Sequence, residues 1–521
     1  MNNLKDTKVL VLGLGATGLS MAVWCARNGA QVRVWDSREA PPQARDLTEL
    51  VPTATLARGV LEPSLLDGVQ RVLRSPGLAP SDGRIAPLLV TAAERGVPVQ
   101  GELDLFVQAL ADLKTQAGYA PQVLAITGTN GKTTTTSMTA LLVKRAGKRV
   151  ACAGNIGPTM LSTLMAALDR SPANEAAMVG MAYLPEVWVL ELSSFQLHNV
   201  QGFEPNAGVV LNITQDHLDW HGSMPAYVAD KARVFGSQGV MVVNQDDALV
   251  REMVPEAMPE KSAGKGRHAT PAPRAVIRFG RDVPQRQGDF GLIVDNGMTW
   301  LVRAHEADPT HKLRRGEVHE IVLQRLMPAD ALQVRGRHNA ANALAALALA
   351  SAIGCPLAPL LHGLREYRGE PHRVAFVATV REVDAYDDSK GTNVGATVAA
   401  LDGLGADRAP AKLVVILGGD GKGQNFSPLL VPVQRYARGV ALIGRDAGLI
   451  EQALGGSGVA MQRCESLESA TRWAFEQAHA GDAVVLSPAC ASLDMFRNFG
   501  HRAEVFVAAV QAMAQDLGVL V

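Results

Sequence analysis

The chain has 521 residues, of which 47% are hydrophobic, and its 50 basic residues almost balance its 51 acidic ones. This length predicts about three domains rather than one. The balanced charge excludes the strongly basic composition expected of a protein that binds nucleic acid or an anionic membrane surface. The five cysteines form no C-x-x-C pair, so neither a disulfide framework nor a zinc knuckle is predicted, and a reducing cytoplasm fits best.

The first segment, residues 1–118, opens with an apolar run at 9–12 and the loop G-L-G-A-T-G at 13–18. The glycines end the apolar run too early for a signal peptide, so we expect a β-strand. A second strand ends on Asp36, which completes a βαβ unit with dinucleotide-binding spacing. This spacing suits any nucleotide diphosphate, and an NAD-dependent oxidoreductase is one alternative. A later loop, ending at Gly77, is expected at the same edge of the sheet.

The second segment, residues 119–369, begins with an apolar strand at 123–126 and the loop G-T-N-G-K-T at 128–133. Glycines between a strand and a helix present backbone N–H groups to a polyphosphate. Lys132 would reach the outer phosphates, and the Thr133 hydroxyl would face a magnesium ion. The usual P-loop has a glycine where this chain has Ile126, so an Asn-Gly turn before an ordinary helix is the alternative.

Further strands are predicted at 187–190, 207–211 and 240–243. Glu191 follows the first of them, where it is either a magnesium ligand or a surface carboxylate beside a helix that Ser193 caps. The loop at 212–221 contains two histidines and two aspartates, but their spacing matches no zinc signature. Lys231 lies on a predicted helix, and a lysine in such a position usually faces solvent.

The composition changes near the end of the second segment. Residues 255–274 are expected to form a loop, and 299–302 belong to a small antiparallel excursion. The Ala/Leu-rich run at 340–361 approaches membrane length, but polar residues, a glycine and a proline interrupt it, so we predict a buried helix. Asn339 and Asn342 lie near its start, where one of them could cap it.

The third segment, residues 370–521, alternates predicted strands with predicted helices, which favours a mostly parallel sheet. The strands are expected at 413–417, 440–443 and 483–486, and the helices at 447–454 and 467–479. Polar loops follow the apolar runs of this segment. Because such loops meet at the carboxyl edge of a parallel sheet, we expect them to form a ligand-binding face.

Taken together, the loops resemble those of the Mur ligases of peptidoglycan synthesis. The motifs that carry the resemblance are G-T-N-G-K-T-T (128–134), E-L-S-S-F-Q-L (191–197), N-I-T-Q-D-H-L-D (212–219), G-R-H-N-A-A-N (336–342), P-H-R (371–373), D-D-S-K-G-T-N (387–393), G-G-D-G-K-G (418–423) and S-P-A-C-A-S-L-D-M-F-R-N-F (487–499). The resemblance covers nearly the whole chain. It implies an α/β protein with an N-terminal Rossmann-like domain (1–118), a central P-loop-type mononucleotide-binding domain (119–369) and a C-terminal Rossmann-like domain (370–521).

The resemblance also implies a reaction. A monomeric, cytoplasmic, ATP- and magnesium-dependent enzyme would join D-glutamate to UDP-N-acetylmuramoyl-L-alanine, without nucleic acid or membrane as partners. The acceptor carboxylate would attack the γ-phosphate of ATP to give an acyl phosphate, and the D-glutamate amine would then displace phosphate. Phosphoryl transfer of this kind needs charge neutralisation and positioning more than covalent help from the protein.

Matching the motifs position by position implies a role for individual residues. ATP would be contacted by Gly128, Thr129, Asn130, Gly131, Lys132, Thr133, Thr134, Asn339, Asn342, Arg373 and Asp388. The catalytic residues would be Lys132, Glu191, His217 and Lys231, with two magnesium ions held by Thr133, Glu191, His217 and a carbamylated Lys231. The UDP substrate would meet Ala16, Thr17, Asp36, Ser37, Arg38, Gly77, Asn155 and Ser193, and D-glutamate would meet Thr392, Lys422, Ser492 and Phe499.

This chain departs from the family pattern by two apparent insertions, near 171–185 and within 254–319, whose function the sequence does not indicate. Two further hypotheses stay open at this level. A folate-polyglutamate ligase would use related motifs without a UDP-sugar, and a nucleotide-binding scaffold would bind ATP without turnover.

Overall fold

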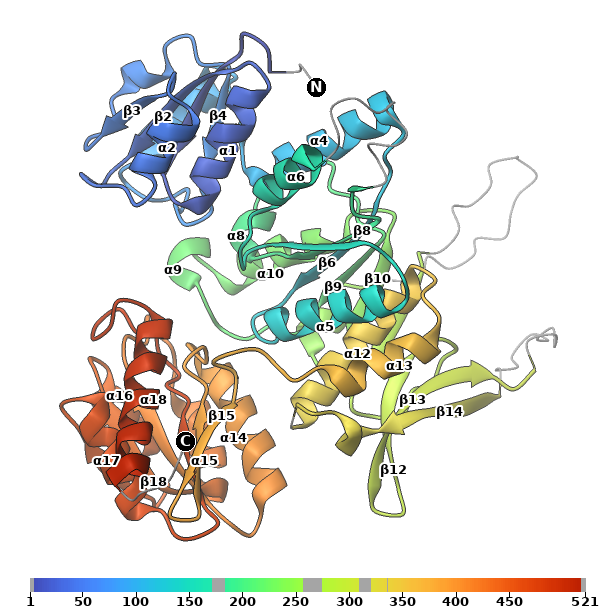
Figure 1. Cartoon of the computed structure of the whole chain (residues 1–521), viewed down its shortest axis with the longest axis vertical. Coiled ribbons are helices and arrows are strands. Elements are labelled where there is room, and N and C mark those ends of the chain that lie inside the picture. The colour runs from blue at the N-terminus through green and yellow to red at the C-terminus, as the bar shows by residue number, and fades with distance from the viewer. Residues whose placement is uncertain (1–3, 171–182, 256–273, 309–319, 335, 517–521) are drawn as a thin grey trace.

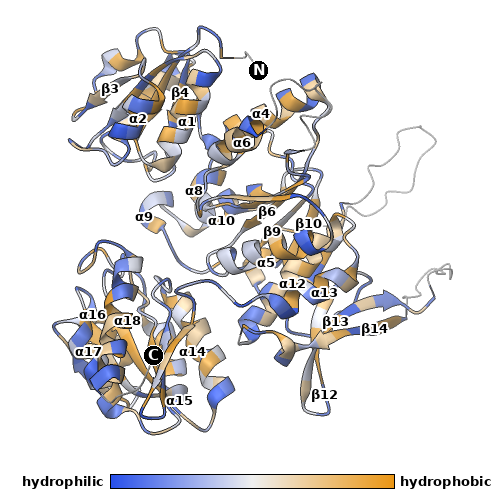
Figure 2. Ribbon diagram, viewed as in Figure 1, coloured by the Kyte–Doolittle hydropathy of each residue, from blue (hydrophilic) through white to orange (hydrophobic). Residues whose placement is uncertain are grey.

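The computed structural model describes residues 4–170, 183–255, 274–308, 320–334 and 336–516. Figure 1 shows three lobes that follow one another along the chain, each built around its own β-sheet. The apolar residues gather in the sheets and on the helix faces that cover them, as the orange ribbon in Figure 2 shows. The α/β fold expected from the sequence is therefore confirmed.

The N-terminal lobe contains a five-stranded parallel sheet in the order β3-β2-β1-β4-β5. Its elements are β1 (Lys8–Leu12), α1 (Ala16–Arg27), β2 (Gln31–Asp36), α2 (Ala44–Leu50), β3 (Thr55–Arg58), the 3-10 turn η1 (Pro63–Leu66), β4 (Arg71–Arg74), α3 (Ala86–Glu94) and β5 (Val99–Gln100). Glycine is required at position 18, because a Cβ there would lie 1.9 Å from the Gly13 carbonyl oxygen. The loop therefore turns tightly into α1, as its spacing predicts.

The central lobe contains a nine-stranded sheet in the order β14-β13-β12-β11-β10-β9-β6-β8-β7. Its elements are α4 (Glu102–Ala117), β6 (Gln122–Thr127), α5 (Lys132–Arg145), β7 (Val150–Gly154), α6 (Met160–Asp169), β8 (Val187–Glu191), α8 (Ser194–Leu197), β9 (Ala207–Val210), α9 (Leu218–His221), α10 (Met224–Ala232), η3 (Arg233–Phe235), β10 (Val240–Asn244), α11 (Ala248–Arg251), β11 (Val276–Phe279), β12 (Phe290–Asp295), β13 (Met298–Glu306), β14 (Ile321–Pro328), η4 (Ala329–Ala331), α12 (Arg337–Ala352) and α13 (Leu357–Glu366). Strands β12, β13 and β14 pair antiparallel, which confirms the predicted antiparallel excursion.

The Ala/Leu-rich stretch at 340–361 is not one helix, so that expectation was wrong. Gly354, with φ +80°, and Pro356 separate α12 from α13. The expectation that the stretch is buried holds, because α12 packs against α5 and against strands of the central sheet. No helix among the described residues is both long enough and apolar enough to cross a membrane.

Helix α4 lies before the predicted domain boundary at 118 but packs on the central lobe. Its Phe106 ring meets Trp188 of β8 edge-on, with 4.9 Å between the ring centroids, and Figure 1 shows α4 beside α6. Residues 256–273 of the predicted loop and parts of both insertions, residues 171–182 and 309–319, lie outside the described residues.

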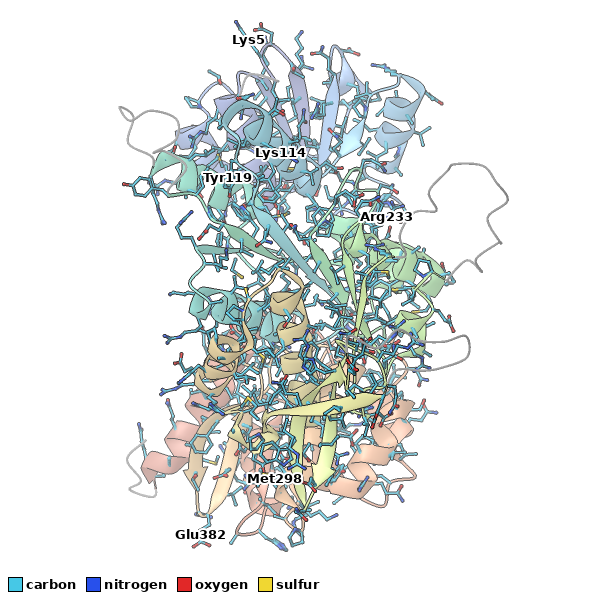
Figure 3. The ribbon with its side chains drawn as sticks, turned by 90° about the vertical axis from the view of Figure 1, so that its right-hand side faces the viewer. Lys5, Lys114, Tyr119, Arg233, Met298 and Glu382 are labelled. Carbon is cyan, nitrogen blue, oxygen red and sulfur yellow. The ribbon has the colours of Figure 1, made fainter. Side chains whose placement is uncertain are left out.

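The C-terminal lobe contains a six-stranded sheet in the order β15-β16-β20-β17-β18-β19, antiparallel only between β15 and β16. Its elements are β15 (Ala375–Val380), β16 (Val383–Asp387), α14 (Val394–Arg408), β17 (Leu413–Gly418), η5 (Ser427–Leu429), α15 (Leu430–Tyr436), β18 (Ala437–Ile443), α16 (Ala447–Leu454), β19 (Ala460–Arg463), α17 (Leu467–Gln477), β20 (Ala483–Leu486) and α18 (Phe499–Asp516). In Figure 3, Glu382 of this lobe and Met298 of the antiparallel excursion lie at the end of the molecule opposite Lys5.

Candidate functional site

The loop between β6 and α5 has the geometry that its glycines predict. A Cβ on Gly131 would lie 2.7 Å from Asn342 Oδ1, and one on Gly128 would lie 2.9 Å from Leu211 Cβ. Ile126, which occupies the position of the missing P-loop glycine, is a fully buried strand residue paired with Glu191 and Val209. The turn therefore starts two residues later, at Gly128, and needs no glycine before it.

Two lysine side chains converge on this loop. Lys132 Nζ donates hydrogen bonds to the carbonyl oxygens of Gly128 and Thr129, both at 2.8 Å. Lys231 Nζ, on α10, donates to the same Gly128 oxygen at 2.8 Å and lies 4.7 Å from the centre of the Tyr227 ring. Burial lowers the pKa of both amines. Lys231 is 1% exposed, so the expectation of a solvent-facing lysine was wrong.

Glu191 ends β8 beside the loop and is 2% exposed, which excludes the surface-carboxylate alternative. Its Oε1 accepts a hydrogen bond from Asn155 Nδ2 at 2.9 Å, whereas its buried Oε2 has no hydrogen-bond partner among the described residues. A buried carboxylate oxygen without a donor fits a cation aimed at it. Ser193 caps the short helix α8, because its hydroxyl accepts from the Gln196 amide at 3.2 Å.

His217 immediately precedes α9 and adopts a left-handed backbone conformation with φ +54°. Burial lowers the pKa of its imidazole to about 4. The charge of Asp216 raises this pKa, whereas the charges of Lys422, Lys132 and Lys231 lower it further. The ring is therefore neutral at pH 7 and keeps a lone pair for a ligand. The influence of Lys422 also shows that the C-terminal lobe approaches His217.

A cleft that is open to solvent lies between the central and C-terminal lobes. It brings together the predicted ATP residues Asn130, Gly131, Thr134, Asn339, Asn342, Arg373 and Asp388. His338 and Glu370 also line it; neither was predicted as a site residue, although His338 stands inside the G-R-H-N motif. Neither asparagine caps α12, whose N-cap is Gly336; instead Asn342 Nδ2 donates to Asn339 Oδ1 at 3.2 Å.

Asp388 directly follows β16, on the wall of this cleft. It is 5% exposed, and burial raises its pKa to about 7 despite a hydrogen bond from Ser487 Oγ at 2.7 Å. The loop between β6 and α5, residues 128–131, is called the phosphate loop below. Its Asn130 Oδ1 accepts a hydrogen bond from Asn393 Nδ2 of the C-terminal lobe at 2.9 Å. The C-terminal lobe is thus closed onto the phosphate loop.

Three of the residues predicted for D-glutamate lie on loops of the C-terminal lobe, and the fourth, Phe499, begins α18. Lys422 is exposed and has φ +52°, Ser492 is 4% exposed, and the Thr392 amide donates to the Lys390 carbonyl at 2.9 Å. Lys390, which the sequence analysis did not select, places its Nζ 5.6 Å from the centre of the Phe499 ring. Cationic and aromatic groups therefore share this face.

In the N-terminal lobe, Asp36 organises the first glycine loop. Its Oδ2 accepts from the Leu14 amide at 2.7 Å and from Arg38 Nη2, also at 2.7 Å. Burial alone would raise the pKa of Asp36, but these hydrogen bonds lower it to about 2. Ser37 Oγ accepts from Arg84 at 3.0 Å, while Ala16 and Gly77 are exposed and Thr17 is half-buried.

A second cleft, also open to solvent, lies between the N-terminal and central lobes and contains none of the predicted site residues. Beside it, the Arg74 guanidinium carbon of the N-terminal lobe lies 5.3 Å from the centre of the Trp220 ring of the central lobe. This stacking contact joins the lobe predicted to hold UDP to the loop that carries His217.

Three protein-family models match the chain. They are the Mur ligase MurD-like N-terminal domain over residues 7–101, the Mur ligase middle domain over 126–350, and the Mur ligase glutamate ligase domain over 372–490. The chain is 58% identical over 520 residues to the UDP-N-acetylmuramoylalanine–D-glutamate ligase of Albidiferax ferrireducens, covering 99% of this chain and 98% of that protein.

Two further similarities agree with these matches. The corresponding ligase of Burkholderia mallei is 55% identical over 520 residues, with 98% of each chain covered. Among solved structures, a MurF ligase from Thermotoga maritima in complex with ADP has a TM-score of 0.54 and 16% identity, covering 99% of this chain and 97% of that one. At this identity the structural match concerns the fold alone.

Proposed function

The chain belongs to the Mur ligase family, and on this premise we propose that it uses ATP to join D-glutamate to UDP-N-acetylmuramoyl-L-alanine during peptidoglycan synthesis. The observation that carries the proposal is the 58% identity, over nearly the full length of both chains, to a UDP-N-acetylmuramoylalanine–D-glutamate ligase. The convergence of Lys132, Lys231 and Glu191 on the phosphate loop supports it independently. Family membership also decides against the NAD-dependent oxidoreductase.

The nucleotide would lie across the central and C-terminal lobes. We propose that its phosphates take the place of the carbonyl oxygens that Lys132 now contacts, and that the N-terminus of α5 adds backbone N–H donors. The nucleoside would occupy the cleft beside Asn339 and Asn342, with Asp388 accepting from the ribose hydroxyls. These residue roles are proposals drawn from geometry and family motifs together.

The site also fits magnesium. Among the described residues, no three His, Cys, Asp or Glu side chains gather as a ready-made metal site. We therefore propose that the ions are held jointly by ATP phosphate oxygens, the unpartnered Glu191 Oε2, the Thr133 hydroxyl and the neutral His217 ring. The metal would neutralise charge on the transferring phosphoryl group.

Lys231 suits the modification that the family motif implies. Because burial lowers its pKa, the amine is readily found without its proton, and an unprotonated amine can attack carbon dioxide. The new N–C bond gives a carbamate, and the proton leaves to water. The resulting carboxylate would be anionic, whereas an ammonium cannot bind a metal ion.

The proposed chemistry has two steps. The acceptor carboxylate forms a bond to the γ-phosphorus of ATP while the bond to ADP breaks, and the acyl phosphate remains. The D-glutamate amine then bonds to the acyl carbon, and phosphate leaves with the bonding electron pair while the amine loses a proton. Lys132 is placed to balance negative charge in the first step, and Lys422 to bind a D-glutamate carboxylate.

All three lobes that the reaction needs lie within one chain, so we propose that a monomer is sufficient. A cytoplasmic location agrees with nucleotide substrates and with the five cysteines, which are all free thiols in the structure. The domain limits 1–118, 119–369 and 370–521 remain proposals, because α4 contacts the central lobe.

The proposal is tested by phosphate release with ATP, UDP-N-acetylmuramoyl-L-alanine and a panel of amino acids. We expect turnover with D-glutamate and little with L-glutamate, L-alanine or a diamino acid. Equal or better turnover with another amino acid would contradict the substrate assignment. Turnover that required a folate and no UDP-sugar would favour the folate-polyglutamate alternative, and ATP binding without any turnover would favour the scaffold.

A further inference from the structure

A hydrogen-bonded cluster, buried except for the partly exposed His198, lies next to the site but includes none of its predicted residues. Asp230 Oδ2 is 2.8 Å from His198 Nδ1 and 3.0 Å from His221 Nδ1, and His221 Nε2 is 2.9 Å from Ser194 Oγ. The exposed fractions of the side chains are 1% for His221 and 9% for Asp230. Because a carboxylate only accepts, both Nδ1 atoms donate to Asp230, and His221 Nε2 is left to accept from the Ser194 hydroxyl.

Ser194, His221 and Asp230 have the hydrogen-bond order of a hydrolase triad. A nucleophile must be reached by its substrate, however, and Ser194 is 2% exposed and lines neither of the two clefts described above. Because no substrate can reach Ser194, the cluster does not act as a hydrolase. Its role must lie in the contacts that it makes within the protein.

The three connected helices each adjoin a predicted catalytic residue. Helix α8 starts with Ser194, three residues after Glu191, and His198 directly follows it. Helix α9 ends with His221 and is preceded by His217. Figure 1 shows α8, α9 and α10 together, between the N-terminal and C-terminal lobes. One carboxylate, Asp230 on α10, therefore ties together the elements that follow Glu191 and His217.

Asp230 is also the immediate neighbour of Lys231. Successive residues on an α-helix point about 100° apart, so the two side chains leave α10 in different directions. Asp230 is bound to the histidines, while Lys231 Nζ reaches the Gly128 oxygen at 2.8 Å. Fixing Asp230 from two sides therefore fixes the rotation of α10 about its axis, and with it the direction in which Lys231 points.

We propose that Asp230, held by His198 and His221, is a positioning residue that orients Lys231 toward the phosphate loop for the ligation reaction. The inference rests on the function proposed above. It predicts that loss of the Asp230 contacts slows the chemical step and leaves substrate binding intact, because no residue of the cluster is placed against ATP or the UDP-sugar. A misplacement of about 1 Å at a reacting group costs about a hundredfold in rate.

The first test replaces Asp230 by Asn, which keeps the shape but removes the negative charge that both Nδ1 donors share at Oδ2, and puts an NH2 group in place of one carboxylate oxygen. We expect kcat to fall between about tenfold and a hundredfold, with both nucleotide and acceptor KM within about threefold of wild type. The matched control is Asp219→Asn, since Asp219 is an exposed aspartate on α9, and it should keep wild-type kcat. A kcat of Asp230→Asn within twofold of wild type would overturn the inference.

The second test separates orientation from packing. In His221→Asn the side-chain amide can replace Nδ1 and still donate to Asp230, whereas in His221→Gln the longer side chain can replace Nε2 and reach Ser194 instead. Both variants lose the ring. If Asp230 positions Lys231, the Asn variant keeps much more kcat than the Gln variant, and the Gln defect does not add to that of Asp230→Asn. Equal losses in both His221 variants would show that only the ring packing matters.

The third readout does not depend on the reaction. In a crystal structure of Asp230→Asn we expect the Lys231 Nζ to Gly128 oxygen distance, 2.8 Å in the wild type, to exceed hydrogen-bond range, about 3.5 Å. An unchanged distance would overturn the positioning inference alone. A wild-type chain that failed to join D-glutamate to the UDP acceptor would instead overturn the proposed function, so the two failures are distinguishable.

Discussion

Arg373 donates a hydrogen bond from Nη2 to Thr133 Oγ1 at 3.1 Å, although 240 positions separate the two residues. Thr133 is the second residue of α5 in the central lobe, and Arg373 lies just before β15 in the C-terminal lobe. The Thr133 hydroxyl, which is proposed to bind magnesium, and the Arg373 guanidinium are therefore already in contact. Closure of these two lobes brings a positive charge to the phosphate loop.

Arg373→Ala should weaken ATP binding by about tenfold to a hundredfold, because a hydrogen bond to a charged group contributes about 1.5–3 kcal/mol. Binding of the UDP acceptor should change little, since it is assigned to the N-terminal lobe. Calorimetric titration with each ligand measures both effects. Loss of acceptor affinity equal to that of ATP would contradict the assignment of Arg373 to the nucleotide.

Lys132→Ala should abolish phosphate release, because the outer phosphates would lose the cation placed for them beside Gly128. The dissociation constant of the UDP acceptor should stay within about threefold of wild type, and Lys144→Ala, an exposed lysine on the same helix, is the control. A collapse of acceptor binding in Lys132→Ala would show that the two ligands do not occupy different lobes.

Asp36→Asn should have the opposite effect, with weaker acceptor binding and unchanged ATP binding. The carboxylate holds the Leu14 amide and Arg38 at the loop proposed for UDP, and an amide cannot accept all of these donors. We expect a loss of about tenfold or more, as for hydrogen bonds that involve a charged group. Fluorescence titration with the UDP acceptor measures the change. Glu39→Gln, at an exposed neighbouring position, should behave as wild type.

ATP affinity should depend on pH through Asp388. Burial raises its pKa to about 7, above the value of 3.8 in an exposed carboxyl, so the side chain is mostly protonated at pH 6 and mostly ionised at pH 8. Only the ionised form accepts from both ribose hydroxyls, so affinity should rise about tenfold between these pH values. Asp388→Asn removes this component while leaving the titration of ATP itself. Parallel pH profiles for the two proteins would contradict the prediction.

The same shift has a consequence for stability. Between about pH 4 and pH 7 the folded protein binds more protons at Asp388 than the unfolded chain does. Its contribution to the free energy of unfolding therefore falls as pH rises through this range, and bound ATP should offset the loss.

Glu191→Gln should raise the magnesium concentration needed for half-maximal phosphate release by roughly tenfold to a hundredfold. The substitution keeps an acceptor for Asn155 but turns the unpartnered Oε2 into a donor, which repels a cation. ATP binding without magnesium should be unchanged or stronger, because a nearby negative charge is removed. A magnesium dependence identical to wild type would show that Glu191 is not a ligand.

Local features could be predicted from the sequence because they depend on residues that are close along the chain. The glycines at 128 and 131, the strand before them and the helix after them are enough to predict the phosphate loop, although its backbone is also held by distant residues such as Asn212. The period and composition of the strands likewise predicted the sheet of each lobe. The stretch at 340–361 was mispredicted as one helix because its Ala/Leu-rich composition outweighed the interruption by Gly354 and Pro356, where the backbone turns.

The burial of polar side chains could not be predicted, because it depends on contacts between distant segments. Lys231 was expected to face solvent, yet it contacts Gly128, 103 positions away. The Asp230 cluster is equally hidden from the sequence, since His198 is separated from Asp230 by 32 positions and by an intervening strand. Nothing in a helical lysine or a loop histidine indicates which neighbour will exclude water from it.

The sequence by itself determined which loops carry the chemistry and which family they belong to, because motifs of glycine, lysine and carboxylate are spaced by local backbone geometry. Only the tertiary structure decided the protonation states of those groups. The neutral His217 ring, the raised pKa of Asp388 and the lowered pKa of Lys231 all arise mainly from burial, which removes water from these groups in the folded chain.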